Sequence, residues 1–208
     1  RAHLQAADAL TAMRLALFDF DGTLTTRDSL MPFLRQVVGT PRFVAGLAAL
    51  SGPLLSYALG RTANDVAKQQ VLGHFLRGRE LADLDSCGRA FADAHLPGLL
   101  RPATMAALKA HRAAGDTCVL VSASLDVYLQ PWAERQGLHA VLCSRLEVDA
   151  RQRVTGRLQP ANCWGPEKAR RIREWLGARR PEHITAWGDS RGDDAMFALA
   201  DTVHRVRG

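Results

Sequence analysis

The stretch LALFDFDGT, residues 15–23, decides the fold. Its apolar start is shorter than an ordinary helix, and the turn formers Asp21 and Gly22 end it, a pattern typical of a buried strand. Asp19 and Asp21 follow this strand directly. Carboxylates so close together repel each other unless a cation or a shared proton compensates their charge. The stretch therefore predicts a strand with an acidic site at its carboxyl end.

Short apolar runs recur later in the chain, and helical patterns separate them. We expect further strands at Thr117–Val121, Ala140–Ser144, His183–Trp187 and Thr202–Val206. We expect helices over 102–114, before Gly137 with an interruption at Pro131, over 167–176 and over 193–200. Strands that alternate with helices predict right-handed crossovers and a parallel sheet, so the predicted fold class is α/β with a Rossmann-like core.

Residues 30–96, between the first two strands, carry only helical patterns, clearest in Val66–Leu76 and Glu80–Ala94. We therefore predict a core domain of residues 1–29 and 97–208 and an inserted all-helical domain of residues 30–96. A second small element is expected at Leu146–Leu158, where two β-patterns flank the polar turn DARQR and predict a hairpin.

An uncharged segment of the insert, residues 43–59, is close to the length that spans a membrane. Gly52 and Pro53 interrupt it, so we favour a buried or partner-facing helix pair over a membrane segment. Contact with lipid through residues 43–59 stays open as an alternative.

Composition excludes a disordered chain, because 47% of the 208 residues are apolar and 23% are charged. The net charge of +6 comes from residues 145–180, whose arginines are expected on solvated helix faces, so no nucleic-acid partner is expected. The four cysteines form no C-x-x-C pair, which indicates a reducing compartment and predicts a cytoplasmic protein. The first ten residues lack the apolar core of a signal peptide and the initiator Met, so we expect a trimmed chain.

Polar side chains follow several of the predicted strands. Ser122 ends the second strand, Asp189 ends the fourth, and Asp193 comes four residues later. Lys168 lies early in the helix before the fourth strand. Ligand sites of parallel sheets lie at the carboxyl ends of the strands, so these groups are expected to meet Asp19 there. Carboxylates without His or Cys favour Mg²⁺, and an added ammonium and hydroxyl suit a phosphate group that a carboxylate could attack.

Four ordered motifs carry a resemblance to a known family. They are DFDGT (19–23), VSAS (121–124), GPEKARRI (165–172) and GDSRGDD (188–194). In these residues the chain resembles the haloacid dehalogenase superfamily, in its phosphatase branch with a small helical C1 cap, the phosphoserine-phosphatase-like subfamily IB. The resemblance implies the α/β fold of that superfamily, with residues 30–96 as the cap.

The resemblance also implies roles for single residues. Asp19 would be the nucleophile and a Mg²⁺ ligand, and Asp21 the general acid and then the base, with its backbone carbonyl on Mg²⁺. Lys168 would neutralise the phosphate and steady Asp19. Asp189 would bind Mg²⁺, and Asp193 would support the metal directly or through water. Since a halide leaves without a proton, the acid at position 21 favours a phosphate ester over a haloacid as substrate.

The phosphate itself would contact Ser122, Lys168 and Thr23, together with backbone N–H groups near Phe20 and Ala123. The resemblance thus implies a Mg²⁺-dependent phosphomonoester hydrolase that forms an aspartyl-phosphate.

The substrate is expected to be a small phosphorylated metabolite, with Asp28 and Arg61 as the candidates that contact it beyond the phosphate. Phosphoserine phosphatases usually have Glu where this chain has Asp28, Gly where it has Ala123 and Asn where it has Gly192. The alternatives are a lipid-phosphate phosphatase similar to phosphatidylglycerophosphate phosphatases, which residues 43–59 would suit, and a phosphate-binding scaffold without turnover. The sequence leaves the leaving group and the oligomeric state open.

Overall fold

The strand that opens the deciding stretch, β1 (Arg14–Phe18), lies in the middle of a five-stranded parallel sheet. The computed structural model describes residues 13–207, so the expectation for the first ten residues lies outside the described part. The strand order is β3-β2-β1-β6-β7, with all neighbours parallel. The other strands are β2 (Thr117–Leu125), β3 (Ala140–Ser144), β6 (His183–Gly188) and β7 (Thr202–Arg205). The predicted α/β class is confirmed.

Successive side chains of a strand point to opposite sides of the sheet, and in β1 both sets are apolar. Helices therefore cover both faces. Ala16 and Phe18 belong to the apolar cluster that also contains buried residues of α6 (Pro102–Ala113) and α7 (Asp126–Arg135). Leu15 and Leu17 belong to the cluster with α8 (Pro166–Leu176) and α9 (Asp194–Phe197). A fully buried Leu or Phe stabilises the fold by about 1.5–3 kcal/mol, so both layers contribute to holding β1.

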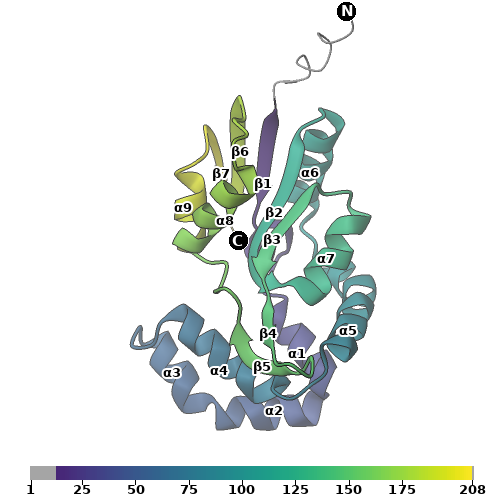
Figure 1. Ribbon diagram of the computed structural model, residues 1–208, viewed down its shortest axis with the longest axis vertical. Helices are drawn as coiled ribbons and strands as arrows, with labels where there is room; N and C mark the ends of the chain where they lie inside the picture. Colours follow the sequence, from purple (N-terminus) through teal and green to yellow (C-terminus); the bar gives the residue numbers. More distant parts are fainter. Residues whose placement is uncertain (1–12, 208) are drawn as a thin grey trace, which may run out of the picture.

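The insert is helical, as the sequence predicts, and lies beyond one end of the sheet (Figure 1). Its helices are α1 (Leu30–Val38), α2 (Thr40–Ala49), α3 (Ser51–Ala58), α4 (Asn64–Leu76) and α5 (Leu81–Ala94). We call this group of helices the cap. The rings of Phe33, Phe91 and Tyr128 pack together, which joins α1 and α5 of the cap to α7 of the core.

The predicted hairpin is present as β4 (Leu146–Val148) and β5 (Val154–Leu158), an antiparallel pair. It runs away from the sheet and lies among the cap helices (Figure 1). Gly156 faces Gly73 of α4 so closely that a Cβ at position 156 would lie 2.4 Å from the Gly73 Cα. The hairpin is therefore packed as part of the cap, a placement that its sequence pattern does not reveal.

Two boundaries differ from the sequence prediction. β2 continues past Val121 to Leu125, and its register with β3 shifts between Ser122 and Leu125. The helix α7 is not interrupted at Pro131, which lies inside it. Buried neighbours such as Leu129 and Trp132 hold the helix there although proline donates no backbone hydrogen bond.

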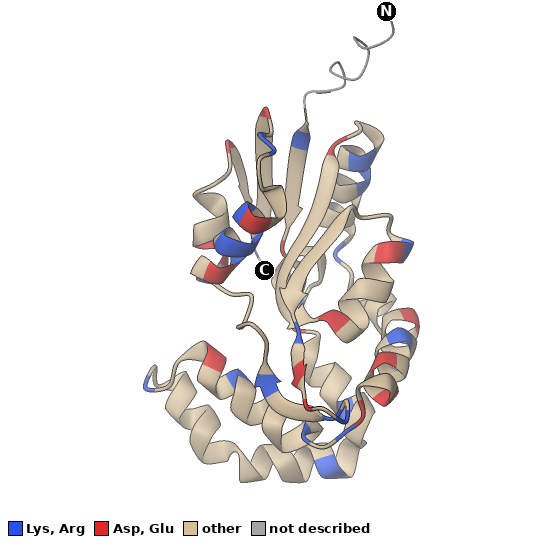
Figure 2. Ribbon diagram, in the orientation of Figure 1, with Lys and Arg blue, Asp and Glu red and all other residues tan. Residues whose placement is uncertain are grey.

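The uncharged segment 43–59 forms parts of two separate helices, α2 and α3, as expected, but α3 is not buried, so the expectation of a buried pair is wrong for this helix. Within residues 13–207 the structure has no helix whose length and apolar character would let it cross a membrane. None of the residues of α3 is buried, and its ribbon carries neither basic nor acidic colour in Figure 2. Leu55 and Leu59 are exposed at its end.

Several arginines of residues 145–180 form hydrogen bonds within the protein. Arg170 and Arg171 on α8 both donate to Glu167, and Arg171 also donates to the carbonyl oxygen of Ala161 at 2.6 Å. Arg153 in the hairpin donates to Glu80 at the start of α5, at 2.8 Å. These contacts account for a share of the basic residues that the sequence gathers there.

Candidate active site

Asp19 stands where β1 ends, and the next residues form a tight turn, Phe20–Leu24. Its N–H donates to the carbonyl oxygen of Trp187 in β6 at 2.9 Å, which extends the sheet by one residue. Gly22 in the turn has a φ of 80°, and a Cβ there would lie 2.3 Å from a carboxylate oxygen of Asp189. Glycine is thus required at position 22 for two reasons, the backbone conformation and the approach of Asp189.

Lys168 links two acidic residues of the site. It projects from the first turn of α8, and its Nζ lies 2.6 Å from Asp19 Oδ1 and 2.6 Å from Asp193 Oδ1. All three side chains are buried. Burial alone would lower the pKa of Lys168, but the attraction of Asp19 and Asp193 outweighs it and raises the pKa. Burial raises the pKa of Asp19 to about 7 in spite of Lys168.

An acidic group with the geometry of a metal site lies beside this ion pair. Asp19, Asp189 and Asp193 each present a carboxylate oxygen, and these oxygens lie within 4.8 Å of one another. Oxygen ligands at this spacing fit a hard divalent cation such as Mg²⁺. Thr23 donates to Asp19 at 3.3 Å or to Asp189 at 3.4 Å, which helps to keep the two carboxylates together.

The Asp193 carboxylate accepts more hydrogen bonds from its own loop than the carboxylates of Asp19 and Asp189 do. Its Oδ2 accepts from the N–H groups of Asp189 and Ser190 at 3.2 and 3.1 Å and from the Ser190 hydroxyl at 3.2 Å. Since Oδ1 receives Lys168, every contact of Asp193 serves the loop or the lysine. This arrangement favours Asp193 as a residue that orients Asp189 and Lys168 beside the metal site. Gly192 leaves room for Trp164, whose Nε1 would lie 2.4 Å from a Cβ there.

Asp21 is held by hydrogen bonds to residues outside the acidic group. Its Oδ1 accepts from the N–H of Ser29 at 2.9 Å, and its Oδ2 accepts from the hydroxyl of Ser124. Ser29 in turn donates to the hydroxyl of the fully buried Tyr128 at 3.1 Å. Burial raises the pKa of Asp21 to about 6, and the nearby charge of Asp28 acts in the same direction. A carboxyl in these surroundings can hold a proton near neutral pH.

Ser122 and Ala123 lie on the irregular part of β2. The buried Ser122 Oγ accepts from the N–H of Ser124 at 3.0 Å, so its own proton remains available to a ligand. The register shift that begins at Ser122 also brings Ser124 to Asp21. Sequence reasoning missed Ser29, Ser124 and Tyr128, because only the VSAS motif hinted at Ser124 and the shift itself has no sequence signature.

A cavity of about 230 Å³ opens between this site and the cap. Asp21, Ala123 and Ser124 form its core side. Its cap side is mostly apolar and is formed by residues including Leu30, Met31, Leu54, Ala67 and Val71. Tyr57, Asn64, Lys68, Asn162 and Asp28 complete the wall. The cavity therefore extends from the proposed acid Asp21 into the cap.

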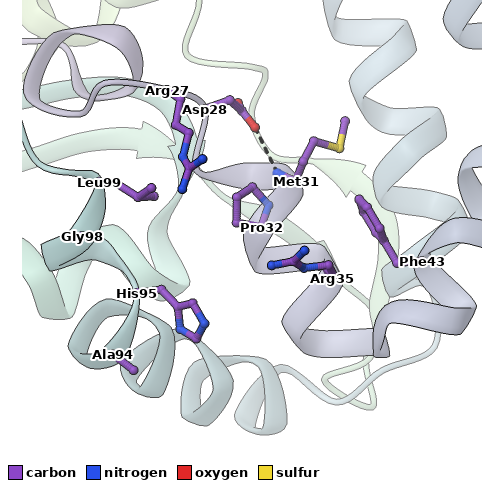
Figure 3. Close-up of a pocket in the computed structure, with 10 residues that line it drawn as sticks. All are labelled: Arg27, Asp28, Met31, Pro32, Arg35, Phe43, Ala94, His95, Gly98 and Leu99. Carbon is purple, nitrogen blue, oxygen red and sulfur yellow. Dashed lines mark hydrogen bonds between the residues drawn. The ribbon is translucent and has the colours of Figure 1, made fainter.

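Of the two residues expected to contact the substrate, Asp28 lines the cavity and Arg61 does not. Asp28 lines the cavity, although its Oδ1 also accepts from the N–H of Met31 at 3.0 Å, as Figure 3 shows. Figure 3 looks into a second hollow of about 530 Å³ that Asp28 and Met31 also border, with Arg27 and Arg35 on its wall. Arg61 is exposed in the loop after α3 and belongs to neither wall. The cavity receives Lys68 instead, which sequence reasoning missed although it is the one lysine of the insert.

Comparisons with known proteins show the family and the fold of this chain. The family model for haloacid dehalogenase-like hydrolases matches residues 16–198. Protein CicA of Caulobacter vibrioides is 37% identical over 187 residues, which cover 90% of this chain and 83% of CicA.

Solved structures with the same fold include a protein of unknown function from Bordetella pertussis Tohama I, with a TM-score of 0.80 and 23% identity over 93% of this chain and 89% of that one. They also include a substrate-bound phosphoserine phosphatase, with a TM-score of 0.65 and 15% identity over 92% of this chain and 84% of that one. At identities of 23% and 15%, these likenesses show the shared fold alone.

Proposed function

We propose, from the premise that the chain belongs to the haloacid dehalogenase-like hydrolase family, that it is a phosphomonoester hydrolase and that Asp19 is its nucleophile. One observation carries the proposal. Asp19 is buried at the carboxyl end of β1, in contact with Lys168 and within the acidic group, while a second carboxyl, that of Asp21, is held two residues away on a separate hydrogen-bond network. Two carboxyl groups in different surroundings suit a nucleophile and an acid.

The proposed reaction has two steps. A carboxylate oxygen of Asp19 attacks the phosphorus atom, and the bond from phosphorus to the alcohol oxygen breaks while the Asp21 carboxyl gives its proton to that oxygen. The Asp21 carboxylate then takes a proton from water, whose oxygen attacks the phosphorus atom of the aspartyl-phosphate. Inorganic phosphate leaves and the Asp19 carboxylate is restored. Ser29 and Ser124 keep Asp21 aimed toward the cavity, where the alcohol would lie.

Charge compensation in this proposal comes from Lys168 and from a divalent cation. Asp19 and Asp189 would hold Mg²⁺ with the backbone carbonyl of Asp21, and the ion would neutralise charge on the phosphoryl oxygens. Ser122 and the N–H groups near Phe20 and Ala123 would donate hydrogen bonds to the phosphoryl group.

Thr23 already donates to the carboxylates of Asp19 or Asp189. Its expected contact with phosphate is therefore replaced in the proposal by a positioning role.

A small leaving group suits the cavity best. Its volume of about 230 Å³ lies below the range of roughly 300–1,000 Å³ that is usual for drug-sized ligands. Asp28 stays a candidate contact at its wall, whereas Arg61 has no part in the proposal because it lies away from the cavity.

Turnover of p-nitrophenyl phosphate tests the proposal. We expect hydrolysis with Mg²⁺, loss of activity in excess EDTA and recovery when Mg²⁺ is added back, because the acidic group repels an anionic substrate without its cation. Release of p-nitrophenolate is followed by absorbance. Hydrolysis that continues unchanged after complete chelation would contradict the metal site. Binding of a phosphate analogue without any hydrolysis would point to a scaffold.

A lipid phosphate is a second candidate substrate, favoured by the exposed apolar residues Leu55 and Leu59, which follow the cavity-lining Leu54 in the chain. The wild type should then float with anionic liposomes, and a Leu55→Glu, Leu59→Glu double variant should stay in the bottom fraction, because a charge on this face opposes insertion. Leu54 is left unchanged so that the cavity wall is kept. Equal flotation of the two proteins would remove the lipid candidate.

A further inference from the structure

A hollow of about 620 Å³ lies on the cap and shares no residue with the cavity that Asp21 lines. The end of α1, the helix α2, the end of α4 and the link 77–79 form its wall. Every wall residue that can carry a charge is basic, and these residues are Arg42, His74, Arg77 and Arg79. We call this site the arginine hollow. Its volume is in the range that is usual for small-molecule sites.

The backbone holds two of these arginines in place. Arg77 Nε donates to the carbonyl oxygen of Thr155 in the hairpin at 3.1 Å, and Arg79 Nε donates to the carbonyl oxygen of Phe75 at 3.3 Å. Within residues 13–207, their terminal guanidinium nitrogens form no hydrogen bond. Because each Nε is fixed, the terminal N–H groups are presented at defined places and remain available to a ligand.

The basic charge of the arginine hollow has no matching carboxylate. In the part of the chain that the structure describes, no ion pair involves Arg42, Arg77 or Arg79. Glu80, the acidic residue that follows the link in the chain, accepts from Arg153 at 2.8 Å. Positive groups that are gathered without an anion repel one another, so a bound anion would lower the free energy of the site.

The basic wall continues into an adjoining hollow of about 530 Å³, separate from the one in Figure 3, because His74 and Arg77 line both. Arg157 of β5 adds a further basic group there, and no acidic residue lines its wall. The Arg77 side chain lies beside the contact between α4 and β5, with its Nε 3.7 Å from the place of a Cβ at Gly156. The basic groups thus extend over two joined hollows, which suits an elongated anion better than a single phosphate.

We propose that the arginine hollow binds a soluble polyphosphate, a ligand with two or more linked phosphate groups, at a site separate from the active site. A guanidinium group pairs with phosphate oxygens through two parallel hydrogen bonds, and linked phosphates carry enough charge for several arginines to share. Arg77 would be the central contact because it lines both hollows. The concave shape favours such a small ligand over a membrane surface or a nucleic acid. The site does not depend on the proposed phosphatase function.

Calorimetric titration with inorganic tripolyphosphate tests this proposal. EDTA is present so that no cation draws the ligand to the acidic group, and physiological ionic strength weakens attraction to scattered surface charges. The wild type should bind one ligand per chain. Arg77→Gln should bind about 10-fold more weakly or worse, the size of a lost charge-assisted hydrogen bond. Arg61→Gln, which removes an exposed arginine of the cap outside both hollows, is the matched control and should bind as the wild type does.

Arg42→Gln is a second variant that keeps the test informative if Arg77→Gln disturbs the hairpin. Arg42 is exposed, so its replacement should leave the fold intact and weaken binding by about 10-fold. Absence of binding to the wild type would overturn the proposal. So would an equal loss in Arg61→Gln and Arg77→Gln, because it would show a general attraction to the net charge of +6.

Vesicles of phosphatidylglycerol distinguish a membrane from a soluble ligand. Flotation of the protein with these vesicles that requires Arg77, without any binding of tripolyphosphate, would overturn the proposal in favour of a membrane surface. Neither measurement involves turnover, so a failure of the phosphatase proposal would leave both results unchanged.

Discussion

Asp19→Asn is expected to reduce kcat on p-nitrophenyl phosphate by about 10⁴-fold or more, a scale typical of the loss of a nucleophile. The amide keeps the size of the side chain and can still accept a hydrogen bond from Lys168, but it cannot attack phosphorus as a carboxylate does. Wild-type enzyme that is quenched in acid during turnover of a phosphate-labelled ester should retain label on the protein. Asp19→Asn should retain none.

Asp194→Asn provides the matched control for this experiment. Asp194 is exposed, follows Asp193 directly and pairs with Arg205 at 2.8 Å, so its neutralisation alters charge close to the site without touching the acidic group. Its kcat should stay within a few-fold of the wild type. Unchanged turnover in Asp19→Asn, or label that remains bound to it, would refute the aspartyl-phosphate route.

Lys168→Met is expected to have the largest effect on stability. The change leaves Asp19 and Asp193 buried without the ammonium that lies 2.6 Å from each, and loss of one partner from a buried ion pair typically costs about 3–5 kcal/mol. For a chain of this size, the midpoint of thermal unfolding should fall by roughly 6–20 °C. Activity should fall by about 100-fold or more, because a charge that compensates the phosphoryl group is lost.

Circular dichroism melts of the purified variants check this expectation. Lys109→Met removes the same charge from an exposed position on α6, so its stability should stay within about 0.5 kcal/mol of the wild type. Mg²⁺ should return part of the stability lost in Lys168→Met, because a cation bound by the folded acidic group stabilises that state. A midpoint equal to that of the wild type would show that the ion pair does not hold the site together.

The sheet and the position of the acidic site follow from the sequence because both depend on local patterns. Apolar runs such as LALF mark the strands, and the carboxyl ends of parallel strands meet at one edge, so Asp19 and Asp189 had to be close. The family resemblance added the roles of single residues and the interpretation of the helical insert as a cap. These roles remain predictions, and the variants above address those of Asp19 and Lys168.

Features that depend on packing between distant segments escaped prediction. The contact of Ser124 with Asp21 needs a register shift in β2, which no residue pattern announces. In the sequence, Lys68 looks like any other lysine of a helix. Its contact with Asn162 depends on how α4 packs against the core. Arg61 drew attention by its charge alone, yet the loop after α3 leaves it exposed. Pro131 would end an isolated helix, but buried neighbours keep α7 intact.

The close approach of Gly156 to Gly73 shows that the hairpin and α4 pack together as one unit. The hairpin also accepts backbone hydrogen bonds from the cap: Gly78, between α4 and α5, donates to Val154, and Leu81, the first residue of α5, donates to Gln152. The unit that covers the active site thus contains residues 30–96 and 146–158. The second segment lies within the stretch 97–208 that the sequence analysis assigns to the core. A chimera that exchanges specificity with a relative must therefore transplant both segments, since a foreign helix in place of α4 would need its own partner for Gly156.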